Sequence, residues 1–581
     1  MQQLVAFSIG PVQSFIASSR KTTDLWGGSF LLSELTETAM ALVSDSFGMD
    51  SVEWIQPRPM IDGNTARQDT ASFPNRFLCL VTSNENETKE KLRQVENNLK
   101  SWLTEKGVNS VAELFHKKSL TGYINTQVNE QLQSALEIFW AFVPYSDQDS
   151  YHEQRLEVES MLASVKNNRP VSYDVQHDLV CTVCHQREAL TAKEPTEEAT
   201  HYQLKEAMRD LWKPAWEDPS RAKEHEYLCS VCAVKRMRRK MLTFPPFPSV
   251  RAFNTFNLNH EVLNEEGDPE SLEGTDQERY YAVVFFDGDD MGQWISGAKS
   301  ESNKATIEES KTITEKLSRF ASTGISESAK DKNIRVIYSG GDDVLAIGSI
   351  MDILDFTQEI RQSFSDPTIG FDKRATGSAG IVIAPEKAPL QQVMNYGRQA
   401  EARAKAYKNS LDGSRKDAFT IHFLRNSGQQ RRMTLPFTTP IPELTPDWFN
   451  MNGKNILLEL IKMANKWKHL ELSPQFIYHF HREFQQVAAE WEYRDKARLT
   501  SGKPFQSNEG IELIRGELTR LINHSAMASS LESADTTAKL ADELSSLYLI
   551  HRGDFTSYIH LLEMLRYLSR LPKMMEEESH V

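Results

Sequence analysis

The chain has 581 residues, of which 39% are hydrophobic and 25% are charged, and its formal net charge at pH 7 is −15. This composition is typical of a multidomain globular protein, and the negative charge argues against a protein that binds nucleic acid over its whole surface. No apolar run is long enough to cross a bilayer, and no basic segment of the kind found in signal peptides opens the chain. We therefore expect a cytoplasmic protein that does not contact a membrane.

The first 150 residues have the pattern of a small α+β unit. We expect strands over residues 4–9, 51–55 and 76–82 and helices over residues 12–20, 88–103 and 128–143. Gly27-Gly28 is interpreted as a hinge before a further apolar helix. A strand–helix–strand start followed by more strands predicts a small sandwich, and one interpretation is a degenerate palm without an acidic pair of its own.

Residues 151–258 are predicted to be helical and to bind zinc. Two CxxC pairs lie in this region: Cys181 with Cys184, and Cys229 with Cys232. Each pair can present two thiolates to one tetrahedral ion, so structural Zn²⁺ is favoured over free thiols. The neighbouring dipeptide His177-Asp178 is interpreted as incidental, since a metal phosphohydrolase needs further spaced His/Asp pairs. An acidic helical stretch over 147–169 is expected to be peripheral.

A basic run, Lys235–Lys240, follows the second CxxC pair. Five of its six residues are basic, and they could contact RNA phosphates or a nucleotide triphosphate. The alternative is a solvated helix end, and the sequence does not decide between the two. A linker over 259–278, rich in Glu, Gly and Asp, then precedes the unit in which we place the catalytic residues.

The catalytic unit, residues 279–430, is indicated by acids at the ends of two predicted strands. Tyr281–Phe286 is a continuous apolar run that ends at Asp287, as expected of a buried strand. Ile334–Ile347 predicts a β-hairpin with Gly340-Gly341 at its turn and Asp342-Asp343 directly after it. Adjacent carboxylates repel each other unless a cation lies between them. An acidic surface turn is the alternative to a site for Mg²⁺ or Mn²⁺ with nucleotide phosphates, and the second acidic strand end argues against it.

The remaining pattern of this unit predicts a βαββαβ order, typical of a ferredoxin-like palm. The further helices and strands are expected over residues 304–322, 353–364, 375–384, 390–408 and 418–424. The backbone amides around Met291-Gly292 are suited to phosphate oxygens. Lys405 follows Glu401 by one helical turn, so it forms either an i,i+4 pair or, if it points inward, a cation for the triphosphate.

The acids predict a two-metal reaction in which Asp287 and Asp342 bind the ions and Asp343 supports or orients one of them. One ion lowers the pKa of the attacking hydroxyl, and the other stabilises the departing pyrophosphate. Residues 431–581 are expected to be helical apart from a Pro-rich turn over 436–446, and they form a helical bundle. The five expected helices cover residues 455–468, 473–491, 508–522, 536–548 and 554–567.

In this order the motifs resemble the large polymerase/cyclase-like subunit of type III CRISPR effector complexes, Cmr type. The motifs that carry the resemblance are Ile9–Ile16, Asp24–Ser29, Pro74–Phe77, the two CxxC pairs, Asp287–Gly292, Gly340–Asp343 and Ser378–Gly380. The resemblance implies two facing palms with ATP between them, a zinc-bearing helical domain and a C-terminal helical domain.

The resemblance also implies a function. Guide RNA (crRNA) and target RNA would be held through other Cmr-type subunits, and target binding would switch on the synthesis of 3′-5′-linked cyclic oligoadenylate from ATP. Asp287, Asp342 and Asp343 fall on the metal positions. The nucleotide-binding positions are Gly288, Asp289, Asp290, Met291, Gly292, Gly340, Gly341, Ser378 and Lys405.

The chain departs from the family pattern because it begins almost directly at the first palm, so we expect the HD nuclease activity to be missing. Some family members that lack this domain join AMP to S-adenosylmethionine, and the sequence does not exclude that acceptor. A stand-alone diguanylate-cyclase-like enzyme is disfavoured because Asp343-Val344 stands where that family has Glu-Phe. A non-catalytic scaffold is disfavoured because the three acids are intact.

Overall fold

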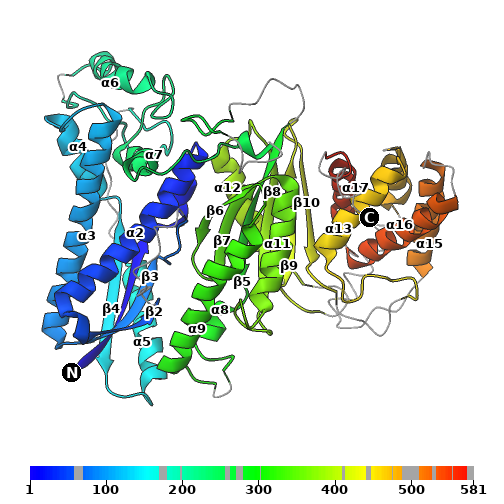
Figure 1. The fold of residues 1–581 in the computed structure, drawn as a ribbon, viewed down its shortest axis with the longest axis horizontal. Helices are drawn as coiled ribbons and strands as arrows, with labels where there is room; N and C mark the ends of the chain where they lie inside the picture. Colours follow the sequence, from blue (N-terminus) through cyan, green and yellow to red (C-terminus); the bar gives the residue numbers. More distant parts are fainter. Residues whose placement is uncertain are drawn as a thin grey trace.

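The structure is a computed structural model, and it carries a mixed α/β fold with two sheets and many helices. It describes residues 1–57, 70–168, 179–196, 199–254, 262–269, 279–300, 303–408, 413–439, 446–473, 475–486, 509–525, 531–551 and 554–571. His177-Asp178 and parts of the linker over 259–278 lie outside these ranges. Figure 1 shows the first sheet at the N-terminal end of the molecule, the second sheet in the middle and the C-terminal helices at the other end.

The first sheet is four-stranded and antiparallel, in the order β2-β3-β1-β4. Its unit comprises β1 (Gln2–Gly10), α1 (Gln13–Ala17), α2 (Thr22–Phe47), β2 (Val52–Gln56), β3 (Arg76–Thr82), α3 (Glu85–Leu114), α4 (Tyr123–Gln133) and β4 (Glu137–Tyr145). The expected strand over 76–82 is confirmed. The expected helix over 128–143 is wrong in its second half, where β4 forms an edge strand. The apolar spacing of α4 continues into β4, but the aromatic and β-branched residues of β4 favour a strand.

Both faces of β1 are covered, which explains its continuous apolar run. Val5 and Phe7 point into the core beneath α2 and α3, and Leu4 and Ala6 point to the opposite face. That opposite face is packed by α5 (Tyr151–Asn167), so the prediction that this helix is peripheral was wrong. The first unit therefore includes a helix that lies beyond the predicted boundary at residue 150.

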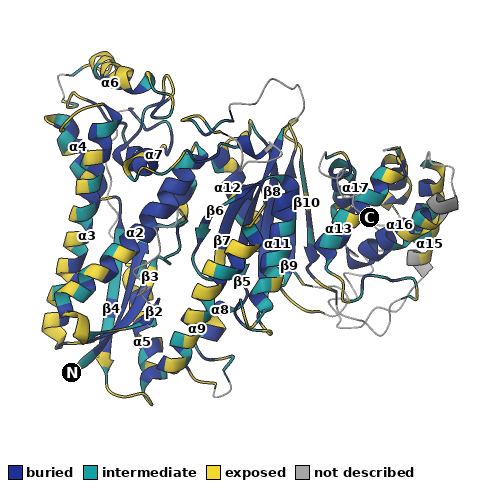
Figure 2. Ribbon diagram, in the orientation of Figure 1, coloured by how far each residue is buried: buried dark blue, intermediate teal, exposed yellow. Residues whose placement is uncertain are grey.

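The second sheet has six strands in the order β10-β9-β8-β5-β7-β6. Its strands are β5 (Tyr280–Gly288), β6 (Ile334–Ser339), β7 (Asp343–Gly348), β8 (Gly377–Pro385), β9 (Ala418–Leu424) and β10 (Gln430–Pro436). Its helices are α8 (Met291–Ile295), α9 (Ile307–Arg319), a π-helical turn over Phe320–Gly324, α10 (Ile325–Ala329), α11 (Ile350–Ser365) and α12 (Leu390–Lys405). Figure 2 shows that the strands of this sheet are largely buried.

The two sheets share one topology. Each sheet contains the four strands of a βαββαβ unit, and across the sheet these strands lie in the order fourth, first, third, second. This is the ferredoxin-like order. In the second unit, α11 packs on one face, and α12 packs on the opposite face, against β8, β9 and β5. The N-terminal unit is therefore palm-like, as one interpretation of its sequence held.

Two further sequence expectations need correction. Residues beyond 430 do not begin with a helix, since β10 pairs antiparallel with β9 and extends the catalytic sheet to Pro436. Gly27-Gly28 is not a hinge, because α2 runs unbroken from Thr22 to Phe47. The glycines instead allow close helix packing: a Cβ at Gly27 would lie 2.1 Å from the Lys235 carbonyl oxygen.

The helices of the cysteine region, α6 (His201–Trp216) and α7 (Ser230–Met241), lie beside the first unit, and α7 packs against both α2 and α3. The basic run Lys235–Lys240 belongs to α7. Neither the RNA-contact nor the solvated-helix interpretation fits it, because four of its five basic residues are buried. Arg236 forms ion pairs with both Asp24 and Glu226, and Arg238 forms an ion pair with Glu34.

The C-terminal helices pack on one another and on the second sheet, and α17 contacts β10. The described helices are α13 (Ile456–His469), a helix over 475–486, α15 (Glu509–Ser525), α16 (Leu531–Ile550) and α17 (Phe555–Leu568). In the part of the chain that the structure describes, these correspond to the five expected helices, while residues 487–491 of the second expected helix and 440–445 of the expected Pro-rich turn lie outside that part. Within the described ranges, no helix combines the length and the apolarity that a membrane span requires.

Candidate active site

Three acidic residues lie at one end of the second sheet, on or directly before adjacent central strands. Asp287 at the end of β5 lies opposite Asp343 at the start of β7 in the antiparallel register. The Gly288 N–H donates a hydrogen bond to the Asp342 carbonyl oxygen at 3.1 Å. Asp287 and Asp343 share the side-chain parity of Phe285 and Leu345, so they lie on the α12 face of the sheet.

The turn before Asp342 requires its two glycines. A Cβ at Gly340 would lie 1.8 Å from the Tyr338 hydroxyl oxygen, and Gly341 has a φ of +97°. The Gly340 N–H donates to the Asp343 carbonyl oxygen at 3.0 Å, which closes the turn. The turn therefore fixes where both carboxylates emerge.

Asp342 and Asp343 carry negative charge that no ion pair in the described part of the chain neutralises. Burial raises the pKa of Asp342 to about 6, and burial together with the charges of Asp342 and Glu401 raises the pKa of Asp343 to about 7. By accessible surface, however, Asp342 is half-buried and Asp343 is exposed, and among the described residues no cation lies within ion-pair distance of either. Neighbouring carboxylates that repel one another are the donor type that Mg²⁺ or Mn²⁺ prefers, but the three acids are not gathered within 4.8 Å of one another as the four cysteines are.

Helix α12 supplies charged groups to the same face. Lys405 contacts the Asp287 carboxylate and lies 3.5 Å from Glu401 Oε1, so it forms the i,i+4 pair and points toward the carboxylates, and its role as a cation for the triphosphate stays a prediction. Burial and the neighbouring Lys416 lower the pKa of Lys405 to about 8. Arg398, one turn before Glu401, lies near Asp343 and lowers the pKa of that carboxyl. Arg398 was not predicted and Glu401 was predicted only as a pairing partner, although the i, i+3, i+7 spacing of Arg398, Glu401 and Lys405 places them on one helix face.

Other predicted nucleotide-binding residues are engaged by the protein itself. The Asp289 carboxylate accepts hydrogen bonds from Thr376 Oγ1 and Ser378 Oγ, both at 2.8 Å, and from the Asp417 N–H at 3.0 Å. Asp289 and Ser378 therefore tie β5 to β8 and to the start of β9. Asp290 pairs with Lys416 Nζ at 2.5 Å and with Lys299 Nζ at 3.4 Å. Met291 is buried at the start of α8, and Gly292 faces open space.

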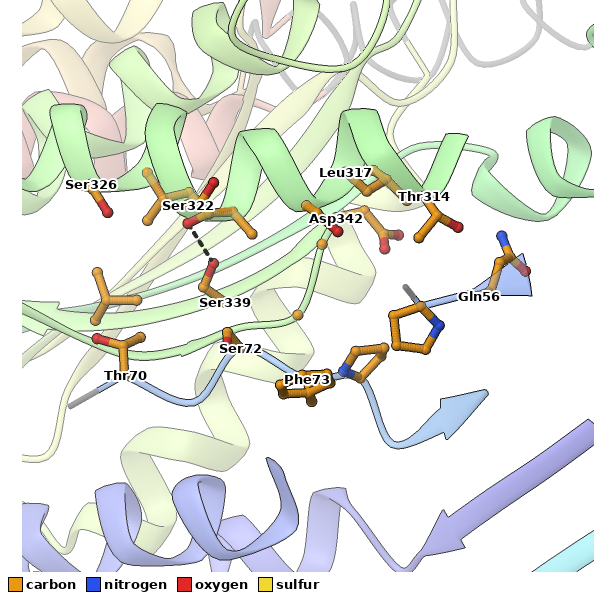
Figure 3. A pocket seen from close by; sticks show the side chains of 18 of the residues that line it. Gln56, Thr70, Ser72, Phe73, Thr314, Leu317, Ser322, Ser326, Ser339 and Asp342 are labelled. Carbon is orange, nitrogen blue, oxygen red and sulfur yellow. Dashed lines mark hydrogen bonds between the residues drawn. The ribbon is translucent and has the colours of Figure 1, made fainter. Parts of the chain in front are cut away.

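A cavity of about 600 Å³ lies between the two palm-like units and reaches the carboxylates at Asp342. Figure 3 shows Phe73 on one side, Leu317 and Thr314 on the other, and Asp342 among them. The first unit contributes the segments around Pro57 and Pro74, and the second contributes α9, the π-helical turn and β6. Such π-turns are frequent at functional sites. Pro74–Phe77 is a recognisable motif of the sequence, but its place in the lining of a cavity was not predicted, because only the packing of the two units creates that cavity.

The four predicted zinc ligands come together as expected. The ligand atoms of Cys181, Cys184, Cys229 and Cys232 all lie within 4.8 Å of one another, and three of these side chains are buried. The first knuckle is held to the second by the Thr182 N–H, which donates to the Tyr227 carbonyl oxygen at 2.9 Å. Four converging thiols are compatible with a closed tetrahedral Zn²⁺ site.

The duplicated βαββαβ sheet with carboxylates at a Gly-Gly turn defines the chain as a protein with a palm fold. A family model described as Cas10/Cmr2, second palm domain, matches residues 280–412, and one described as CRISPR-associated protein Cmr2, N-terminal, matches residues 4–107. Both segments thus match Cas10/Cmr2 family domains, which confirms the resemblance seen in the sequence.

Individual relatives agree with this assignment. The Cmr subunit Cmr2 of Pyrococcus furiosus is 23% identical, over 83% of this chain and 66% of that protein. The Cas10/Csm1 single-strand-specific deoxyribonuclease (subtype III-A) of Streptococcus thermophilus is 32% identical, over 33% of this chain and 24% of that protein. This chain thus spans less than two thirds of the length of either. A chain of the type III-B Cmr-beta structure bound to cognate target RNA has the same fold, with a TM-score of 0.66, 14% identity, and coverage of 98% of this chain and 83% of that one.

Proposed function

We propose that this chain is the nucleotidyltransferase subunit of a type III-B CRISPR effector complex and that it makes 3′-5′-linked cyclic oligoadenylate from ATP. The observation that carries the proposal is the position of Asp342 at one end of the cavity between the palm-like units, beside Asp287 and Asp343. A nucleotide that enters this cavity would bring its phosphates to the carboxylates and its base to the apolar wall that includes Phe73 and Leu317.

In the proposed reaction, the 3′-hydroxyl oxygen of one ATP attacks the α-phosphorus of another. A P–O ester bond forms, the α–β anhydride bond breaks, pyrophosphate leaves, and the hydroxyl proton passes to solvent. Mg²⁺ or Mn²⁺ held by Asp287, Asp342 and Asp343 would lower the pKa of the attacking hydroxyl and offset the charge on pyrophosphate. The chain's own cations, Lys405 and Arg398, stand on α12 beside these carboxylates and favour phosphate binding.

The partners we propose follow from the fold and the relatives. The matched structure is described as bound to cognate target RNA, and we infer that this chain likewise joins Cmr-type subunits that hold crRNA and target RNA. The −15 net charge and the burial of the basic run in α7 support contact with RNA mainly through other subunits. The four-cysteine cluster would hold a structural Zn²⁺ that fixes α7.

The test is product analysis with the assembled complex. Guide RNA, target RNA, Mg²⁺ and labelled ATP are added with and without S-adenosylmethionine, and products are resolved by mass. Oligoadenylates formed from ATP alone and lost in the Asp342→Ala/Asp343→Ala variant support the proposal. A product that requires S-adenosylmethionine keeps the adenylyl transfer and changes the acceptor. No nucleotide product in any mixture would contradict the proposal and favour a scaffold.

A further inference from the structure

Three arginines converge on a small pocket where the second sheet meets the C-terminal helices. Arg425 follows β9, and Arg566 and Arg570 belong to or follow α17. The pocket has a volume of about 60 Å³. Its remaining lining residues are Phe423, Ile477, Tyr478, Glu563 and Tyr567.

The positive charge of this pocket is not neutralised by the described part of the chain. Glu563 is its one lining carboxylate, and that group is engaged by Arg431 of β10. Within the described ranges, no carboxylate forms an ion pair with Arg425, Arg566 or Arg570. Burial and the neighbouring charges of Arg570 and Arg425 lower the pKa of Arg566.

The pocket also contains an unsatisfied donor and an exposed ring. The Arg566 Nε–H is buried without a hydrogen-bond acceptor among the described residues, an arrangement that favours an anionic ligand. Tyr478, which lines the pocket together with Arg566, is 64% exposed and presents its ring at the rim. The floor is fixed by packed rings, since the centroids of Phe423 and Tyr567 are 4.7 Å apart.

The sheet register separates this pocket from the candidate active site. Phe423 pairs with Ile383, which pairs with Ala282 at the start of β5, whereas Asp287 stands at the other end of β5. The pocket therefore lies at the opposite end of the sheet from the carboxylates. A ligand bound there would be separate from the ATP of the proposed reaction.

We propose that Arg425, Arg566 and Arg570 bind a backbone phosphate of single-stranded nucleic acid, with a neighbouring base stacked on Tyr478. Guanidinium groups suit phosphate because their N–H donors match its oxygens in pairs, and several guanidiniums can share one tetrahedral group. An acidic protein segment would use the arginines but has no need for the exposed ring. Exposed aromatic rings beside arginines are the usual platform for unpaired bases.

The test measures the fluorescence anisotropy of a labelled single-stranded oligoribonucleotide at low salt with the full-length chain. Arg425→Gln/Arg570→Gln changes two exposed side chains and so leaves the fold intact. We expect it to weaken binding about tenfold or more and to reduce the slope of log K against log salt. The matched control, Arg403→Gln/Arg432→Gln, makes the same charge change at two exposed arginines outside the pocket and should retain most of the affinity.

Two further arms define the ligand. Tyr478→Ala should weaken binding about tenfold, whereas Tyr478→Phe, which keeps the ring, should bind like the native chain. A DNA oligonucleotide of the same sequence shows whether the sugar is recognised. Equal losses in the pocket and control variants, or no measurable binding by the native chain, would overturn the proposal. The Asp342→Ala/Asp343→Ala variant should bind the oligonucleotide normally, so a failure of the proposed catalytic function remains distinguishable.

Discussion

Arg398 and Gln13 connect the two palm-like units next to the candidate active site. Arg398 Nη2 donates a hydrogen bond to the Gln13 carbonyl oxygen at 2.6 Å, and α1, which begins at Gln13, contacts α12. The same guanidinium lies near Asp343 and Glu401 without a hydrogen bond to either among the described residues. The first unit thus fixes the position of Arg398 through its Nη2 group. The other N–H groups of this guanidinium can donate hydrogen bonds to a ligand at the candidate active site.

We expect Arg398→Ala to reduce the rate of pyrophosphate release about tenfold, because a charge-assisted hydrogen bond contributes about 1.5 kcal/mol or more. The measurement is a steady-state assay of the assembled complex over a range of ATP concentrations. Arg403→Ala, an exposed arginine on the same helix, is the control and should be neutral. Equal rates for the Arg398→Ala variant and the native chain would show that Arg398 only joins the units.

Asp342→Asn/Asp343→Asn should lower catalysis at least about 100-fold, since metal-assisted stabilisation is worth several kcal/mol. The same variant should be more stable than the native chain at neutral pH without Mg²⁺. The folded-state pKa values, about 6 and about 7, lie above the ordinary value of 3.8, so ionisation of these carboxyls destabilises the fold as pH rises from about 4 to 7.

Thermal unfolding at pH 4 and pH 8 checks this stability effect. The difference between variant and native chain should be small at pH 4, where both acids are protonated, and larger at pH 8. Millimolar Mg²⁺ should then raise the unfolding temperature of the native chain and leave that of the variant unchanged. A native chain that is the more stable of the two at pH 8 without Mg²⁺ would contradict the proposed repulsion.

Asp24 and Arg236 form a buried pair between α2 and α7, with Glu226 Oε2 3.0 Å from Arg236 Nη1. Burial alone raises the pKa of Asp24, but the charge and hydrogen bonds of Arg236 outweigh it and lower that pKa to about 2. This stabilisation is present above about pH 4 and is lost as pH falls towards 2. Asp24→Asn should cost about 3–5 kcal/mol of unfolding free energy at pH 7, the usual effect of breaking a buried pair.

Urea unfolding of the Asp24→Asn variant measures this cost. The control is Asp210→Asn, which removes an exposed pair with Lys213 and should change the free energy by less than about 0.5 kcal/mol. Similar midpoints for both variants would show that the buried network is not needed for stability.

The same network shows where sequence reasoning stopped. Arg236 is 212 positions from Asp24 in the sequence, so no local pattern indicates that the two residues pair. The basic residues around Arg236 suggest a charged surface, and only the fold reveals their acidic partners. Local patterns correctly predicted the buried strands over 76–82 and 418–424 and the acidic hairpin, because residue type and turn chemistry determine these elements. The strand β4 was missed because its apolar spacing continues that of α4. The cavity beside Phe73 depends on how the two units pack, which no local pattern encodes.

Gly27→Ala tests the revised role of the Gly27-Gly28 pair. A Cβ placed 2.1 Å from the Lys235 carbonyl oxygen forces α2 and α7 apart, and overpacking of this kind typically costs about 1–3 kcal/mol. Gly292→Ala, at a position where a Cβ meets nothing within 4 Å, is the matched control. If Gly27 served as a hinge, alanine would instead favour the helix and stabilise the chain, so the sign of the change in unfolding temperature decides between the two roles.

Removal of zinc should affect the active site from a distance. Cys229 precedes α7 and Cys232 lies within it, and Lys235 on the same helix donates hydrogen bonds at 2.6 Å to the carbonyl oxygens of Phe15 and Ser18 at the end of α1. The first residue of α1, Gln13, also accepts the hydrogen bond from Arg398 of α12. A change in the position of α7 should therefore shift α1 and weaken the contact between the two units.

We therefore expect Cys229→Ser/Cys232→Ser, or chelation of the native chain, to lower the unfolding temperature and to reduce the affinity for ATP. Zn²⁺ should restore both properties in the chelated native chain, whereas Mg²⁺ should not. Elemental analysis of the purified protein should find one zinc per chain and none in the double variant. Cys79→Ser, which changes the cysteine outside the cluster, is the control for zinc content. A native chain that binds no zinc, with a double variant as stable as the native chain, would show that the four thiols are not a metal site.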